Sequence, residues 1–403
     1  MPGAHRLLAL AVAAFGLTAG CSPHPSPTPP AILELPGPPT TAATVTTPLE
    51  SDRDSADLIN PVVAIADDPV RHTDRSHAVP QWQVAATRYL DERSASWLAG
   101  PPKVGNHFEC AMSCHTTYPY MFVRPALGES PTLSEARTRL LQRVDGDGSW
   151  PEQTGFYGRR GGNTWTRSLA TEAVLNASAL ALHDAAMEQP LSDATLRAMD
   201  RMWEVQQPNG AWPWLNFSLA PWESGNADWG AGQAAIAVGL APEAYRQAHE
   251  DEIARLVGYL RSRHASTQKP MVLHAQLAML WAARGLPELL SDEARGSVVN
   301  AVRAVQHTDG GWALRDLVGR SRRRVRKRDG YATGLATFVL CTETDTQDSV
   351  DAGLTWLRTH QRTDGAWPAW SLNEDAARNH LHMRDAAAAY AVLALTACSA
   401  PQR

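Results

Sequence analysis

The chain has few cysteines, 5 in 403 residues, which excludes a fold built mainly on disulfides. Two of them, Cys341 and Cys398, lie in strongly apolar segments, where we expect buried free thiols. Beyond the N-terminal region the chain also lacks an apolar run long enough to span a bilayer. Its formal net charge of -5 gives no basis for a nucleic-acid partner.

The N-terminus has the three parts of a secretory signal. His5 and Arg6 precede an apolar run from Leu7 to Leu17, and small residues lead to Cys21. The ending Thr18-Ala19-Gly20-Cys21 resembles the lipobox of bacterial lipoproteins, whose cysteine becomes acylated. We therefore expect residues 1–21 to be a signal peptide and the protein to be exported and lipid-anchored on the extracytoplasmic side of a bacterial membrane. The alternative is ordinary cleavage nearby, with Cys21 an incidental residue.

Residues 22–76 are rich in Pro, Ser, Thr and charged residues, so they cannot bury a core and should act as a tether. A domain of residues 77–400 remains, which is a permissible size for one fold.

One phrase recurs in this domain, a Gln followed by Asp-Gly or Asn-Gly and then Trp, with tryptophans at 150, 212, 312 and 367. The spacings are 62, 100 and 55 residues, so one copy has been lost between 212 and 312. The Gln ends a helix, the Gly supplies the left-handed turn that stops it, and the Trp packs back on a neighbouring helix. The phrase therefore marks a repeating helical hairpin.

Two kinds of predicted helix alternate along the repeats. Segments such as "AGQAAIAVGLA" are apolar all round and should be inner helices, whereas "DEIARLVGYLRSR" carries a charged stripe and should face water. Six hairpins can close into a ring without an exposed end. They are expected at 81–128, 132–184, 192–240, 243–286, 292–342 and 348–398.

The phrases Gln206 to Trp212, Gln306 to Trp312 and Gln361 to Trp367 resemble those of squalene-hopene cyclases and protein prenyltransferase β subunits. The resemblance implies an all-α, (α/α)6 toroid. It does not extend to the chemistry, because the cyclases use Asp-x-Asp-Asp to protonate their substrate. The nearest phrase here, Asp145-Gly146-Asp147-Gly148, lacks the third acid, and no convincing zinc set of the prenyltransferase kind is present.

The stretch "HFECAMSCHTTYPYM" in the first hairpin holds Cys110, Cys114 and His115. Two cysteines about one helical turn apart and an adjacent histidine favour covalent haem c, with His115 as the iron ligand. Two alternatives stay open. His107 with these three residues can bind zinc, or the two cysteines can form a disulfide that leaves His115 incidental.

A sixth ligand to such an iron is expected from the last hairpin, which lies beside the first in a closed ring. His382 and Met383 open its inner helix. Met121 follows His115 too closely to reach the opposite face of the iron, and His274 lies across the ring. The iron can equally be five-coordinate and open to substrate.

Aromatic residues near the starts of inner helices should gather at the same rim: Trp165, Trp214, Trp222, Trp229, Tyr331 and Trp370. Such a bowl suits a hydrophobic small molecule, and Trp165, Trp229 and Tyr331 are the pocket candidates. The alternative is that most of these side chains only pack the repeats.

Four acidic residues compete for a catalytic role. Glu172 and Asn176 share one face of an apolar inner helix, where an unpaired carboxylate is costly and a pocket role is plausible. Asp228, Asp329 and Asp385 lie at junctions, where an acid caps a helix as readily as it moves a proton. Glu172 and Asp385 are the catalytic candidates.

The segment Arg315–Arg328 carries eight basic residues. Such a run is usually a solvated loop, but on a tethered protein it can also meet anionic head groups or an acidic redox partner.

Three functions are consistent with these features. The first is a haem-dependent oxidoreductase acting on a terpenoid or quinone-like molecule in the toroid mouth. The second is an electron carrier or sensor with the same haem and no substrate. The third is a haem-free toroid that binds or cleaves a terpenoid, lipid or glycan, with Cys110 and Cys114 as a disulfide.

Overall fold

The computed structural model describes residues 79–99, 114–145, 163–319, 321–373 and 381–398. For Asn163 and Trp165 it describes the backbone and not the side chain. The predicted signal peptide, Cys21 and the tether lie outside these residues. So do His107 and Cys110.

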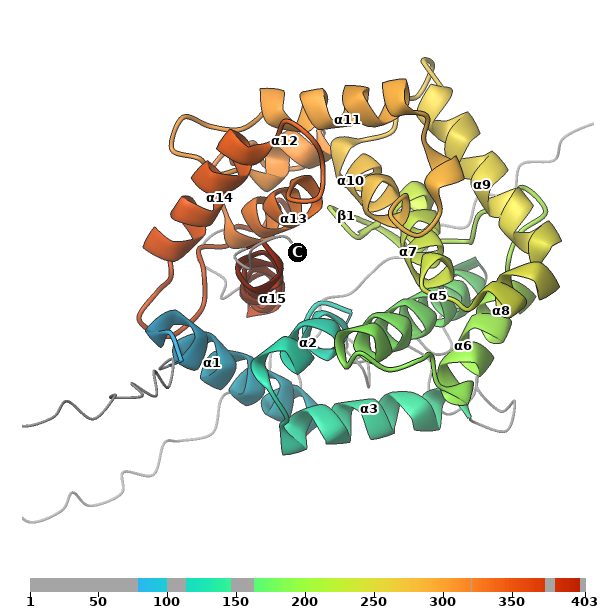
Figure 1. Cartoon of the computed structure of the whole chain (residues 1–403), viewed down its shortest axis with the longest axis horizontal. Coiled ribbons are helices and arrows are strands. Elements are labelled where there is room, and N and C mark those ends of the chain that lie inside the picture. Colours follow the sequence, from blue (N-terminus) through green and yellow to red (C-terminus); the bar gives the residue numbers. More distant parts are fainter. Residues whose placement is uncertain (1–78, 100–113, 146–162, 320, 374–380, 399–403) are drawn as a thin grey trace, which may run out of the picture. The chain divides into compact units, whose positions relative to one another are not determined.

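Twelve helices of the described chain form six pairs in a ring, which confirms the predicted (α/α)6 toroid (Figure 1). The outer helices are α1 (Gln81–Leu98), α3 (Pro131–Val144), α6 (Asp193–Glu204), α9 (Glu250–Ala265), α11 (Asp292–Ala304) and α14 (Gln347–Thr359). The inner helices are α2 (Thr117–Val123), α5 (Asn163–Ala186), α7 (Ala227–Gly239), α10 (Leu273–Ala282), α13 (Gly330–Leu340) and α15 (Leu381–Ala397). The connections add η1 (Arg124–Leu127), α8 (Glu243–Ala248), η2 (Pro287–Leu289), α12 (Leu314–Val318) and strands β1 (Asn216–Leu219) and β2 (Glu223–Ser224).

The inner and outer helices differ in burial as their composition predicts. All residues of α13 are buried, because its small and apolar side chains pack against α14, α15 and α10. On α9 only four residues are fully buried, Ile253, Leu256, Val257 and Leu260, and they repeat at helical spacing along one face. The core therefore lies between the two rings of helices and along the inner one.

Three of the repeated tryptophans fix the outer helices α6, α11 and α14 to the turns that follow them. Trp212, Trp312 and Trp367 are completely buried. Each indole N–H donates to the carbonyl oxygen ten residues earlier, at distances of 2.7, 2.9 and 2.8 Å respectively. The large ring fills the space beneath the turn and its one polar atom is satisfied, so burial carries no polar penalty.

The repeated glutamines connect successive hairpins. Nε2 of Gln206, Gln306 and Gln361 donates to a carbonyl of the next outer helix, at Glu252, Ser349 and Trp82 respectively. The last of these bonds, 2.9 Å long, joins α14 to α1 and closes the ring. The same interaction thus serves between neighbours and across the two ends of the domain.

Cys341 and Cys398 form a disulfide, so the prediction of two free thiols was wrong. Each cysteine follows the last turn of an inner helix, α13 and α15, and these two helices pack side by side with the same direction. Their Cα atoms consequently lie 5.8 Å apart. Apolar surroundings favoured a free thiol in the sequence, but they carry no information about a partner 57 residues away.

Candidate functional site

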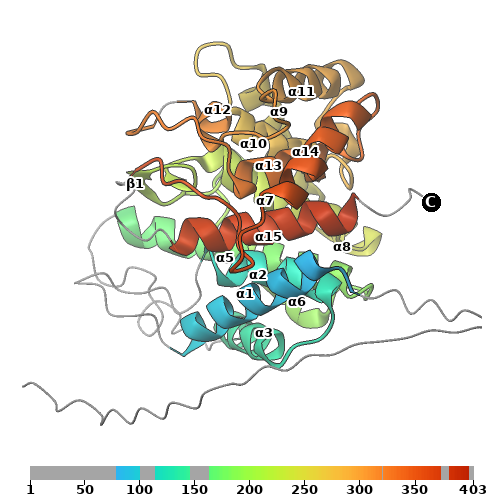
Figure 2. The ribbon, with the colours of Figure 1, turned by 90° about the vertical axis from the view of Figure 1, so that its left-hand side faces the viewer.

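The described outer helices end, and the described inner helices begin, at one rim of the ring, here called the mouth. The short β1–β2 hairpin is also at this rim and is seen at one end of the domain in Figure 2. Its two strands pair antiparallel, with Asn216 opposite Ser224, and Gly225 ends it at φ +72°. The sequence analysis did not anticipate this hairpin.

Trp222 in this hairpin reaches across the mouth to two other hairpins of the toroid. Its ring centroid lies 4.6 Å from that of His115, and its Nε1 donates a 3.1 Å hydrogen bond to Tyr331 Oη. Asn373 holds the hairpin turn on a third side, through two hydrogen bonds with the backbone of Ala220. Trp222 is therefore part of a plug across the mouth rather than the wall of an open bowl.

A small cavity lies beneath the plug. Its lining is mainly apolar and includes Phe122, Leu175, Trp214, Trp222, Trp229 and Tyr390, together with Cys114. The centre of a water molecule can occupy only about 40 Å³ of it, enough for about three waters. A larger ligand enters only if side chains at the mouth move.

His115 follows Cys114 in the chain, and its ring packs against Trp222; both neighbours line this cavity. The side chain of His115 keeps 18% of its exposure, and Nε2 is 4.0 Å from Glu223 Oε1. Burial, and then the nearby imidazole of His382, lower the pKa of His115 from 6.5 to about 3. The imidazole is thus neutral at pH 7, which is the form that binds a metal.

The start of α15 comes to His115, as the closed ring predicted. The ring centroids of His382 and His115 are 5.5 Å apart, with the planes tilted by 55°. Met383 is buried in the hydrophobic core instead. Of the two predicted ligands from the last hairpin, His382 is the one whose ring faces His115.

Asp385, one turn later on α15, connects the two ends of the domain through hydrogen bonds and an ion pair. Its Oδ1 accepts hydrogen bonds from Tyr89 Oη at 2.8 Å and Arg93 Nε at 2.9 Å. Its Oδ2 accepts bonds from Arg93 and, at 2.7 Å, from Thr116 Oγ1. Both oxygens are occupied and Asp385 is 2% exposed, so a catalytic role stays a prediction that these contacts do not favour.

Glu172 is buried on α5 and forms an ion pair with Arg143 of α3. Burial raises the pKa of Glu172 to about 7, although Arg143 opposes the shift. One turn along α5, Asn176 Oδ1 accepts a 2.6 Å hydrogen bond from Tyr118, which lines the cavity. Glu172 thus has the partner that sequence reasoning could not identify, and its catalytic role also stays a prediction.

Trp229 and Tyr331 both face the interior near the mouth. The ring of Trp229 stacks on that of His274 with centroids 3.9 Å apart, and His274 Nε2 lies 2.6 Å from Tyr331 Oη. Trp229 lines the cavity, and Tyr331 is completely buried beside it. The side chain of Trp165, the third pocket candidate, lies outside the described part of the structure.

Asp228 and Asp329 have structural roles. Asp329 caps α13 by accepting from the backbone N–H of Ala332, and burial raises its pKa to about 7. Asp228 forms an ion pair with Arg263 at 2.8 Å.

The basic segment Arg315–Arg328 lies in the fifth junction, and it starts within α12. Part of its charge is neutralised within the domain, since Arg326 pairs with Asp316 at 3.3 Å and Arg328 with Asp309 at 2.6 Å. Exposed basic side chains of this segment are Arg322, Arg324, Arg326 and Lys327.

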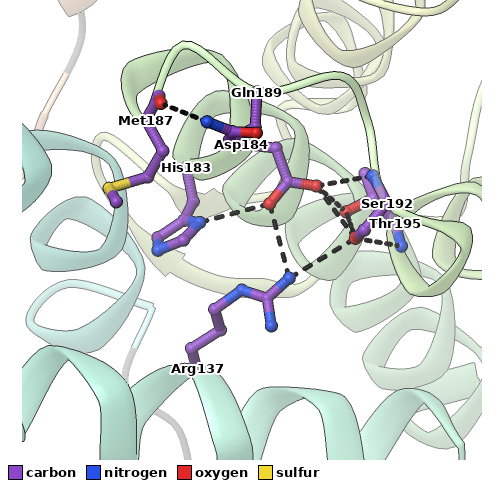
Figure 3. A network of polar contacts seen from close by, with 7 residues as sticks. All are labelled: Arg137, His183, Asp184, Met187, Gln189, Ser192 and Thr195. Atoms are coloured by element: carbon purple, nitrogen blue, oxygen red, sulfur yellow. Dashed lines mark hydrogen bonds and ion pairs between the residues drawn. The ribbon is translucent and has the colours of Figure 1, made fainter.

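A second polar cluster lies at the C-terminal end of α5, whereas the mouth lies at its N-terminal end. Figure 3 shows the contacts of this cluster around Asp184. Asp184 accepts hydrogen bonds from His183 at 3.2 Å, from the backbone and hydroxyl of Ser192, both at 2.9 Å, and from Thr195 at 2.5 Å. Burial alone would raise the pKa of Asp184, but these bonds outweigh it and hold the pKa well below its usual range. Ser192 and His183 both contact Asp184, an arrangement that anchors the α5–α6 turn and differs from a nucleophilic triad.

The zinc alternative depends on His107 and Cys110, which the structure does not describe. Among the described residues, no three His, Cys, Asp or Glu side chains are close enough to hold a metal ion. In the same residues, no helix combines the length and apolarity needed to cross a bilayer.

No protein-family model and no curated protein matches this chain. Similar solved structures include the type II terpene cyclase MstE from Scytonema, which is 14% identical, with a TM-score of 0.48 over 78% of this chain and 96% of that one. An unsaturated glucuronyl hydrolase from Bacillus sp. GL1 is 12% identical, with a TM-score of 0.47 over 78% of this chain and 94% of that one. A glycosidase is 14% identical, with a TM-score of 0.48 over 78% and 98%. At these values the activities of those proteins carry no argument here, and the fold class rests on the arrangement of the helices themselves.

Proposed function

We propose that this chain is an exported haem c protein whose toroid holds the porphyrin at its mouth and exchanges electrons with a hydrophobic, terpenoid or quinone-like molecule. The observation that carries the proposal is the position of His115. A neutral imidazole next to Cys114, with a second imidazole from His382 facing it, is a donor set that suits haem iron.

The described residues fit a porphyrin at the mouth but not inside the cavity. The room for about three waters is far too small for a macrocycle. The rings of Trp222 and His115, in contrast, lie side by side at the mouth, where a flat aromatic group can pack. Cys110 and Cys114 would hold the group covalently and His115 would bind its iron, with His382 as the second ligand. Bound there, haem supplies one-electron chemistry.

The chain's own residues would then position a substrate and exclude water. Trp222 covers the cavity, and the apolar side chains beneath it favour a hydrophobic molecule over a sugar. Gln233 on α7 is a polar group in the lining that can orient a carbonyl or hydroxyl oxygen.

An exported location is part of the same proposal. The disulfide between Cys341 and Cys398 supports it, because disulfides persist in oxidising compartments and covalent haem attachment in bacteria takes place there. The lipobox-like ending at Cys21 would provide the anchor, and the exposed arginines of Arg315–Arg328 would face anionic head groups or an acidic redox partner. Labelling with a radioactive fatty acid, which Cys21→Ala should abolish, tests the anchor.

The test of the haem is a pyridine haemochrome spectrum of the full chain, purified from an exporting host that matures c-type cytochromes. We expect the c-type spectrum, and mass spectrometry should find porphyrin on the peptide that contains Cys110 and Cys114. His382→Ala should keep the covalent group and change the iron's ligation spectrum. His360→Ala is the matched control, because His360 stacks on Trp356 of an outer helix and should leave the spectrum unchanged. Colourless protein with Cys110 bonded to Cys114 would overturn the proposal.

The second candidate is a haem-free toroid that binds a terpenoid or lipid, or cleaves it or a glycan. It is favoured by the cavity itself, whose apolar lining needs no cofactor. Tryptophan fluorescence of the colourless protein, titrated with a terpenoid alcohol, tests it. Saturable quenching that Trp222→Phe alters would support this function.

A further inference from the structure

Three side chains form a hydrogen-bonded row that runs inward from the mouth: the partly buried Trp222, then Tyr331 and His274, from the third, fifth and fourth hairpins respectively. Tyr331 and His274 are both 0% exposed. Trp222 Nε1 is 3.1 Å from Tyr331 Oη, which in turn is 2.6 Å from His274 Nε2. The electron exchange proposed above does not assign any role to these three side chains as a group.

The direction of the Tyr331–His274 hydrogen bond follows from counting protons. An indole N–H only donates, so Tyr331 Oη accepts from Trp222. If His274 Nε2 donated to Oη instead, both the phenolic hydrogen and the lone pair of Nδ1 would lack partners among the described residues, whereas with Tyr331 as the donor only the Nδ1 hydrogen does. Tyr331 therefore donates to Nε2, and the hydrogen of His274 is on Nδ1.

Nδ1 of His274 has no hydrogen-bond partner in the described part of the chain. Burying a histidine with one ring nitrogen unpaired costs free energy of folding, and an apolar side chain would fill the same space without that cost. The 2.6 Å bond is the one interaction that this arrangement secures for Nε2.

Aromatic contacts connect this pair to the mouth. Ring centroids are 4.6 Å apart between His115 and Trp222, and 5.1 Å apart between Trp222 and Tyr331. The face of Trp229 stacks on His274 at 3.9 Å. The π systems are thus in contact from the edge of the cavity to the phenol, which is the arrangement that short-range electron transfer needs.

We propose that Tyr331 is a redox-active tyrosine, with His274 as its proton acceptor and Trp222 as its electronic contact with the mouth. A one-electron oxidant at the mouth removes one electron from Tyr331 through Trp222. At the same time the phenolic proton crosses to His274 Nε2, so that the O–H bond breaks and an N–H bond forms. The products are a neutral tyrosyl radical, an imidazolium ion and the oxidant reduced by one electron.

Two features of the site favour coupling of the two transfers. Burial, followed by the influence of Tyr390 and Asp329, raises the pKa of Tyr331, so phenolate is not available and the proton must leave with the electron. Burial lowers the pKa of His274 to about 3, and the indole face of Trp229 offsets part of this cost to the imidazolium that results.

This transfer of an electron through Trp222 and of a proton to His274 is here called the relay. It rests on the proposed function only for its physiological oxidant, so it is tested without haem. The full chain is produced in a host that does not mature c-type cytochromes and is oxidised with photogenerated tris(bipyridine)ruthenium(III). Freezing and electron paramagnetic resonance then detect radicals, and ring-deuterated tyrosine identifies those on tyrosine by narrowing their hyperfine structure.

We expect a tyrosyl signal in the wild type that is lost in Tyr331→Phe and in His274→Phe. Tyr390→Phe is the matched control, because Tyr390 packs edge-on against Tyr331 at 4.8 Å and should leave the signal intact. Circular dichroism and the unfolding midpoint establish that each variant is folded, and Tyr331→Phe removes only one hydroxyl.

An equal signal in the wild type and in Tyr331→Phe would overturn the relay, and so would an undiminished signal in His274→Phe. The haemochrome assay is separate from this measurement. A chain without haem can still give the radical, and a haem protein without the radical would refute the relay alone.

Discussion

Thr116 Oγ1 donates a 2.7 Å hydrogen bond to Asp385 Oδ2 and so ties the residue after His115 to the last inner helix. The two residues are 269 positions apart in the sequence. Because Arg93 of α1 binds the same carboxylate, one buried group fixes the ring closure and the position of His115 together. The candidate site is thus built at the place where the two ends of the toroid meet.

Asp385→Ala should destabilise the domain by about 3–5 kcal/mol, because it leaves the partly buried Arg93 and the hydroxyls of Tyr89 and Thr116 without their acceptor. It should also release the turn that holds His115, so that diethyl pyrocarbonate modifies His115 faster, as mapped by mass spectrometry. Asp228→Ala is the control, since Asp228 also pairs with an arginine, Arg263, but does not bind Thr116. Equal modification rates of His115 in the two variants would show that Thr116 does not depend on Asp385.

Gly365→Ala should cost more than about 2 kcal/mol of stability, since a left-handed residue with a Cβ costs ~1–2 kcal/mol before any clash. Gly365 has φ +87°, and a Cβ there would meet the carbonyl oxygen of Ala85 in the next outer helix. Gly258→Ala, on the exposed face of α9 with open space around it, should instead stabilise by about 0.5–1 kcal/mol. Chemical unfolding of both variants checks the opposite signs, and a loss of equal size at both positions would contradict the explanation.

The sequence was sufficient for the toroid because its signals are local and repeated. The Gln, Gly and Trp of the phrases at Trp212, Trp312 and Trp367 act within one hairpin or on the next one, so a short-range pattern, together with the alternation of apolar and amphipathic helices, specifies the ring. Ring closure then correctly placed His382 near His115, as a consequence of the fold and not of any local signal.

The contacts that were missed join hairpins through side chains with no shared pattern. Trp222 meets Tyr331 across 109 residues, and Cys341 meets Cys398 across 57. The residue types alone gave no indication of which partner each would find. Glu172 was expected to be costly if unpaired, and the physical reasoning was sound, but Arg143 could be identified only once α3 was packed against α5.

Reduction of the Cys341–Cys398 disulfide should lower the free energy of unfolding by about 2–4 kcal/mol, since the bond closes a loop of 57 residues. Dithiothreitol should therefore lower the unfolding midpoint of the wild type. Dithiothreitol should not change the unfolding midpoint of the Cys341→Ser, Cys398→Ser double variant. That midpoint should already be lower than the midpoint of the oxidised wild type. Cys114→Ser serves as the control, and dithiothreitol should lower its unfolding midpoint as it does for the wild type. If the midpoint of Cys114→Ser does not change with dithiothreitol, the stabilising disulfide is at the mouth instead.

Asp184→Asn should destabilise the domain by about 2–3 kcal/mol at pH 7, because a buried carboxylate that accepts several hydrogen bonds becomes a neutral amide. The pKa of Asp184 is lower in the folded state than its unfolded value near 3.9, so the unfolded chain binds the proton first as pH falls. The stabilisation is accordingly complete above about pH 4 and is lost as pH drops through the folded-state pKa. Guanidinium unfolding at pH 7, 5 and 3 should show the gap between wild type and variant narrowing only at the lowest pH. Glu135→Gln is the control, because it removes an exposed partner of Arg139 and should change the free energy of unfolding little at any pH. If the difference in unfolding free energy between wild type and Asp184→Asn widens on acidification, Asp184 is not held as a stabilising carboxylate.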